Sequence, residues 1–206
     1  MKRFIFNNST DSIVNNGKYF IVSIFFFIIG ISAGVFTELM MSSVEKGNAI
    51  SYFNQYFLLE NMNNDAFTNI FMKSAGSNLG IFLVIICSGL SAIGFPIAIA
   101  ALTYKGATLG FSAALLIESL SFKGIAFIFT SMIPQNLILI PAFLVATVVS
   151  LSMAFYILSN RKTGIKKSLA SSSGPYAFLN IIIALVILTG CFVESFICPI
   201  LTKLIG

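Results

Sequence analysis

The feature that most constrains this chain is a series of long apolar runs that contain no charged side chain. They cover residues 19–37, 74–104, 124–160 and 168–193. An α-helix rises about 1.5 Å per residue and the hydrocarbon core of a bilayer is about 30 Å thick, so about 20 apolar residues complete one crossing. The runs therefore predict helices that cross a membrane several times.

Composition excludes a water-soluble domain as the alternative. Hydrophobic residues make up 57% of the 206 residues and charged residues only 9%, against about 25% charged in an ordinary soluble domain. A soluble fold of this size would lack the charge that keeps its surface dispersed in water. We expect an all-α, polytopic membrane helix bundle in the cell membrane, with residues 1–206 forming a single integral membrane domain surrounded by lipid.

Five transmembrane helices account for the apolar runs. We expect them over residues 19–39, 77–102, 106–120, 136–158 and 176–196. In the second, Pro96 follows Gly94 and removes a backbone donor, which predicts a kink. A turn at Tyr104, Lys105 and Gly106 separates the second helix from the third.

The run over residues 124–160 is too long for one crossing, since a single helix of that length would measure about 55 Å. Pro134, Gln135, Asn136 and Pro141 mark a break. We expect residues 124–133 to form a half-length or re-entrant helix, followed by the fourth full span.

Residues 40–73 form a polar, asparagine-rich connection that we expect to be an extracytoplasmic loop. Phe53, Tyr56 and Phe57 recur at helical spacing, which indicates amphipathic helices lying at the membrane interface. Two roles are open for these aromatic side chains: an aromatic belt that anchors the loop, or a contact surface for a partner.

Basic residues decide the orientation, because cytoplasmic loops are enriched in Lys and Arg. With the amino terminus inside, the cytoplasmic set is Lys2, Arg3, Lys18, Lys105, Arg161, Lys162, Lys166 and Lys167. The outer set is Lys46, Lys73, Lys123 and Lys203. The excess favours the amino terminus inside and the carboxyl terminus outside. Because these residues sit at the ends of spans, orientation explains the net charge of +5 better than nucleic-acid binding.

The sequence offers no catalytic set. It contains no histidine, and we find no nucleophile elbow, zinc-binding helix or phosphate-binding loop. Cys191, Glu194 and Cys198 share a helix face but lack a fourth ligand, so we expect no metal, no cofactor and no enzyme activity.

Placing a polar side chain at membrane depth costs free energy, so each such residue is a candidate for a structural or functional role. We expect Glu194 to hydrogen-bond between helices or to pair with Lys123 or Lys203. Gln135 and Asn136 satisfy the backbone of the helix break, although transporters also place substrate sites at such breaks. Lys105 is expected to extend to the cytoplasmic face.

Glycines four residues apart let two membrane helices approach closely. Gly30 and Gly34 form one such step, and Gly106 and Gly110 form another.

Several motifs together resemble the stage II sporulation protein M family of endospore-forming bacteria. They are Gly94-Phe95-Pro96, Tyr104-Lys105-Gly106, Leu109-Gly110-Phe111, Lys123-Gly124, Ile133-Pro134-Gln135-Asn136-Leu137 and Ile140-Pro141-Ala142. The likeness extends to the stretch from Tyr52 to Phe57 and the segment from Glu194 to Pro199, so it covers nearly the whole chain.

The resemblance implies a non-enzymatic scaffold of the sporulation septum, required for septum migration and engulfment of the forespore. By that likeness its partners are two membrane-anchored peptidoglycan hydrolases, the stage II sporulation proteins D and P, which carry out the peptidoglycan remodelling. Glu194, Phe53, Tyr56 and Phe57 are candidate partner contacts. Related proteins also accompany circular bacteriocins, so the alternative is a permease-type subunit that exports, or protects against, a hydrophobic peptide.

Overall fold

A computed structural model describes residues 9–60, 65–91, 93–120, 124–125, 128–159, 165–198 and 200. Throughout these residues the regular structure is helical. The α-helices are α1 (Ser9–Leu39), α2 (Ser43–Glu60), α3 (Asp65–Gly89), α4 (Phe95–Leu120), α6 (Ile133–Ser159) and α7 (Ile165–Phe192). Two π-helical segments complete the set, η1 (Ile128–Met132) and η3 (Val193–Ile197).

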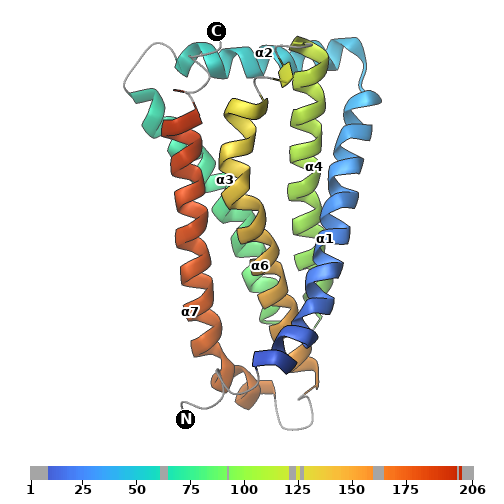
Figure 1. The fold of residues 1–206 in the computed structure, drawn as a ribbon, viewed down its shortest axis with the longest axis vertical. Helices are drawn as coiled ribbons and strands as arrows, with labels where there is room; N and C mark the ends of the chain where they lie inside the picture. Colours follow the sequence, from blue (N-terminus) through green and yellow to red (C-terminus); the bar gives the residue numbers. More distant parts are fainter. Residues whose placement is uncertain are drawn as a thin grey trace.

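Five of these helical segments are long and apolar enough to cross a membrane. They are Gly17–Leu39, Phe67–Gly89, Phe95–Ser119, Ile128–Ser159 and Ser173–Ile197. Figure 1 shows the five side by side, with α2 lying across one end. The predicted all-α bundle of five spans is confirmed. Its N-in, C-out orientation stays a prediction.

The predicted boundary between the second and third spans is wrong. The turn lies at Ser91 to Gly94, where Gly94 N–H donates to Ser91 O at 3.1 Å, so the spans are not residues 77–102 and 106–120. Pro96 is the second residue of α4, where its missing N–H costs no helical hydrogen bond. It therefore starts a helix instead of kinking one, and Lys105 lies inside α4.

Residues 40–73, where we expected helices within an extracytoplasmic loop, are largely helical in the described part of the structure. They contain α2, which carries Phe53, Tyr56 and Phe57, and the first turns of α3. The side chains of these three aromatic residues lie outside the described part of the structure, so their predicted contacts are untested.

The predicted break within residues 124–160 is a change of helix type and not a re-entrant turn. Residues Ile128–Met132 are π-helical and continue directly into α6, so Pro134 is the second residue of α6 and Pro141 lies inside it. Gly124 and Ile125 are helical, and residues 126–127 lie outside the described part. We expected a separate helix over residues 124–133. The described residues 128–132 instead form one continuous helical segment with α6.

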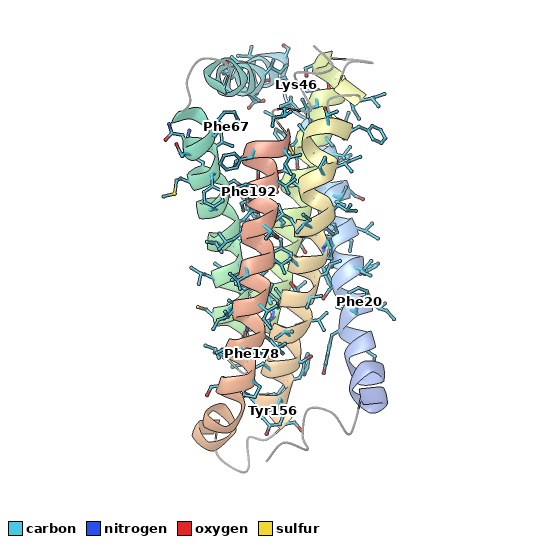
Figure 2. All side chains as sticks on the ribbon, turned by 60° about the vertical axis from the view of Figure 1, so that its left-hand side comes forward. Phe20, Lys46, Phe67, Tyr156, Phe178 and Phe192 are labelled. Carbon is cyan, nitrogen blue, oxygen red and sulfur yellow. The ribbon has the colours of Figure 1, made fainter. Side chains whose placement is uncertain are left out.

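Helix α6 occupies the centre of the bundle and packs against α1, α3, α4 and α7. Ile85, Leu102, Phe143 and Ile187 are completely buried around it. Phe20 of α1 and Phe178 of α7 project from the outside of the bundle (Figure 2) and are 42% and 65% exposed. In a bilayer these outer side chains contact lipid tails.

Helices α1 and α4 pack backbone against backbone. A Cβ atom added to Gly34 would lie 2.0 Å from the carbonyl oxygen of Ala107, and one added to Gly110 would lie 2.1 Å from that of Ile31. Gly30 and Gly106 meet the opposite helix in the same way, at 2.2 and 2.6 Å. The two glycine steps therefore form one interface.

Candidate functional site

The interior of the bundle contains a connected group of polar side chains, which we call the polar tract. It consists of Ser74 and Asn78 of α3, Lys105 of α4, Gln135 of α6 and Glu194 of η3. Ionisable side chains within membrane spans usually face the bundle interior and mark functional sites. The tract is therefore the first candidate for a functional site.

Lys105 supplies the positive charge of the tract. Its Nζ donates to Asn78 Oδ1 at 2.6 Å and lies 5.4 Å from the centre of the Phe143 ring, a cation–π contact. The face of α4 that carries Lys105 also carries the buried residue Leu102. Lys105 therefore points into the bundle, and the expectation that it extends to the cytoplasmic face is wrong.

Asn78 and Ser74 connect this lysine to the carboxylate of Glu194. Asn78, only 4% exposed, donates from Nδ2 to Ser74 Oγ at 3.3 Å and to the Ser74 carbonyl at 3.0 Å. The same nitrogen lies 3.6 Å from Cys191 Sγ. The Ser74 hydroxyl in turn donates to Glu194 Oε2.

Gln135 contacts the same carboxylate from α6. With its amide rotated so that the nitrogen faces Glu194, Gln135 Nε2 lies 2.7 Å and 3.3 Å from the two carboxylate oxygens. The π-helical segments η1 and η3 border this contact, and such segments often occur at functional sites. Glu194 thus makes contacts between helices. The alternative partners Lys123 and Lys203 lie outside the described residues.

Asn136 does not join the tract, although it was predicted together with Gln135. Its Nδ2 donates to the carbonyl of Met132 at 2.8 Å, within its own helical segment. Its Oδ1 is buried without a hydrogen-bond partner among the described residues. Neighbouring positions on a helix point about 100° apart, so the two amides serve different surroundings.

A second group of charges, which we call the α2 clamp, lies at one end of the bundle. Lys46 of α2 is 3.1 Å from Glu38 Oε1 of α1 and 2.6 Å from Glu118 Oε2 of α4, and Figure 2 labels it at that end. Glu38 is only 1% exposed. The hydrogen bond to Glu118, followed by that to Glu38, raises the pKa of Lys46. The clamp fixes α2 to the ends of two spans.

The start of α2 has its own stabilising contact. Ser42 donates from its backbone nitrogen and hydroxyl to Glu45 Oε2, at 2.9 and 2.8 Å, and Glu45 N–H faces Ser42 Oγ at 3.4 Å. This reciprocal arrangement is a capping box. The hydrogen bond from the Ser42 hydroxyl lowers the pKa of the Glu45 carboxyl most, and the hydrogen bond from the Ser42 backbone nitrogen lowers it further.

At the opposite end, side chains of α6 and α7 satisfy the last carbonyls of α3. Ser150 Oγ donates to the Ile85 carbonyl at 2.7 Å, and Tyr176 OH donates to that of Ile86 at 2.8 Å. This arrangement has a structural role at the turn that contains Gly94. Of the helix-break residues, Gly94 and Pro96 lie at this end, while Pro134 and Gln135 lie at the end covered by α2 (Figure 1).

The described residues contain no group of three or more Cys, Asp or Glu that could hold a metal ion.

Comparison with family models then decides the family. The model described as stage II sporulation protein M matches residues 23–199. The chain belongs to the stage II sporulation protein M family. The resemblance predicted from the motifs is confirmed, and the protein is a sporulation-related, multi-pass membrane protein.

The matched region contains the whole polar tract and the α2 clamp. Comparisons with curated proteins and with solved structures return no match.

Sequence reasoning missed most of the polar tract. Asn78 and Ser74 are neutral polar residues in an uncharged run, and composition alone does not distinguish them from the neighbouring Ser77. The available signal was their spacing, since residues four apart share a helix face with the buried Ile70 and Phe82. The clamp was missed because Glu118 is 72 residues from Lys46 in the chain, and because Glu38 and Lys46 lie on different helices.

Proposed function

We propose that this protein is a non-enzymatic membrane scaffold that recruits and anchors peptidoglycan hydrolases at the sporulation septum, where it is required for septum migration and engulfment of the forespore. The observation that carries the proposal is the α2 clamp. It holds a helix across one end of a five-span bundle, anchored to α1 and α4 through Glu38 and Glu118.

Such an arrangement suits a scaffold because it offers two kinds of contact at once. The outer faces of the spans can pack against the transmembrane helix of an enzyme, and α2 can contact the segment that follows that helix. Two linked contacts raise the effective concentration of the second, so weak individual contacts give a stable assembly. The partners proposed from family resemblance are the stage II sporulation proteins D and P.

Co-purification from sporulating cells tests the proposal. A tagged wild-type protein is expected to recover the two hydrolases, and Lys46→Met, which removes the central cation of the clamp, is expected to lose them. Lys18→Met is the matched control, because Lys18 is an exposed lysine on α1 outside the clamp. Recovery of the hydrolases by Lys46→Met at wild-type levels would reject the role of α2.

Engulfment itself provides the cellular test. Cells that lack the protein and are stained with a membrane dye are expected to stop with a flat or bulging septum. Normal engulfment in such cells would contradict the proposal.

The polar tract favours a second candidate function, a permease-type subunit that exports or protects against a hydrophobic peptide. Polar side chains at membrane depth mark substrate pathways in transporters. Pro96 and Pro134 lie at opposite ends of the bundle. The permease role predicts that Asn78→Leu abolishes peptide export and leaves engulfment intact.

A further inference from the structure

The two charges of the polar tract do not touch. Lys105 lies inside α4 and Glu194 lies in η3, and within the described residues no direct ion pair joins them. Two neutral side chains, Asn78 and Ser74, fill the space between them. The tract therefore joins opposite charges through a bridge.

The hydrogen bonds of this bridge all run in one direction. Lys105 donates to Asn78, Asn78 donates to Ser74, and Ser74 donates to Glu194. A chain whose donors all point the same way is polarised, and each bond strengthens the next. This direction matches a cation at Lys105 and an anion at Glu194.

Partial burial inside the bundle makes the two charges depend on each other. A charge withdrawn from water in a membrane protein is tolerated when an opposite charge compensates it, and removing one partner leaves the other uncompensated. Removing both charges at once avoids that penalty. The bridge residues do not replace a counter-charge, since an amide and a hydroxyl are neutral.

The Glu194 end of the tract lies at the end of the bundle that carries α2 (Figure 1). There Phe67 of α3 stacks on Phe196 of η3 at 5.7 Å between ring centres, and Phe192 stacks on Phe196 at 4.4 Å. Figure 2 labels Phe67 and Phe192 close to this end. A shift of η3 would thus disturb the contact between η3 and the start of α3, the helix that follows α2.

We propose that Lys105 and Glu194 act as one bridged ion pair and are positioning residues for the bundle end that carries α2. The inference rests on the proposed function in so far as that end is the surface presented to partners. The pair itself is defined by the contacts within the bundle and is tested separately.

A double-mutant cycle on the purified full-length protein tests the pair. Lys105→Gln and Glu194→Gln are each expected to lower the folding equilibrium constant by about a hundredfold, because each leaves one partly buried charge uncompensated. The double variant is expected to be more stable than either single variant. If the two losses instead add in the double variant, the bridged pair is rejected.

A distance measurement tests positioning. Spin labels on Val44→Cys of α2 and Ile197→Cys of η3, in a chain whose exposed Cys87 is replaced by serine, use two exposed positions at this end. Lys105→Gln is expected to broaden the distance distribution, the double variant to restore it, and the exposed-lysine control Lys18→Gln to leave it unchanged. A distribution that Lys105→Gln does not change would overturn the positioning role.

Recovery of hydrolases separates this inference from the proposed function. If the wild-type protein recovers no hydrolase, the scaffold proposal fails, while the stability cycle and the distance measurement still decide the role of the pair. If the wild-type protein recovers them, the single variants are expected to lose them and the double variant to regain them.

Discussion

At the scale of single residues, Asn78 links the cation of the polar tract to the rest of the tract. Its oxygen accepts from Lys105, and its nitrogen donates to Ser74 and faces Cys191. An apolar residue of similar size would fill the space but would supply neither the acceptor nor the donor. The ammonium of Lys105 would then lose its hydrogen bond within a buried environment.

We therefore predict that Asn78→Leu destabilises the protein by about 1–3 kcal/mol, the cost of leaving a buried polar partner unsatisfied. Chemical denaturation of the purified protein in detergent measures this change. Asn69→Leu is the control, since Asn69 lies on the exposed side of the same helix and its loss is expected to have little effect. Equal stability of the two variants would show that the bridge contributes nothing.

At the scale of helices, glycines decide how closely α1 and α4 approach. The free space around a glycine differs from one position to another in this protein. A Cβ at Gly110 would lie 2.1 Å from the backbone of α1, whereas a Cβ at Gly80 of α3 would have nothing within 4 Å. The same substitution at these two positions should therefore have opposite consequences.

We predict that Gly110→Ala lowers stability by about 1–3 kcal/mol, because the added methyl group forces α1 and α4 apart. Gly80→Ala is expected to leave stability unchanged or to raise it, since alanine restricts the unfolded chain and meets no neighbour. Thermal unfolding of the two variants beside the wild-type protein gives the comparison. A stable Gly110→Ala protein would argue against the backbone contact.

Helix α2 is expected to respond to alkaline pH through the clamp. The pKa of Lys46 is raised above its ordinary value of 10.5, so the folded state holds the proton more tightly than the unfolded state. The stabilising contribution is complete below that ordinary value and is lost as pH rises through the raised pKa. Docking of α2 should thus weaken only in strongly alkaline solution.

The distance between spin labels on Val44→Cys and Ile117→Cys, in a chain whose exposed Cys87 is replaced by serine, measures this docking. It is expected to stay constant at neutral pH and to broaden in the alkaline range. Lys46→Arg is the control, because a guanidinium keeps its charge there and should remove the alkaline step. An identical step in Lys46→Arg would assign it to another group.

At the scale of the whole molecule, five spans place the start of α1 and the end of η3 at opposite ends of the bundle (Figure 1). Lys105 lies in the interior of the bundle, so it is removed from the set of basic residues assigned to the cytoplasmic side. The remaining basic residues still favour the same orientation, since Arg161, Lys162, Lys166 and Lys167 all lie in the sequence between the last two spans.

We predict that alkaline phosphatase fused after Gly206 is active outside the cytoplasm. A fusion within the connection after α6 is expected to be inactive, because that connection lies on the cytoplasmic side. The reverse pattern would invert the bundle and place α2 and the clamp in the cytoplasm, which would exclude contact with external hydrolases.

The amino-acid sequence by itself determined the environment, the number of spans, the glycine steps and the family. These depend on local properties, since hydropathy, helical spacing and short motifs can be read within about 20 residues. It failed at the boundary near Gly94 and Pro96, where one proline is compatible with either a kink or a helix start and the preceding turn decides.

Only the tertiary structure decided which polar groups meet. Lys105, Asn78 and Glu194 lie on three different helical segments, and so do Glu38, Lys46 and Glu118, with α4 contributing to both groups. Their contacts depend on which helices are neighbours and on how each is rotated about its axis. Those properties arise from the packing of the entire bundle, because a rotation of one helix by a single residue, about 100°, would turn Lys105 away from Asn78.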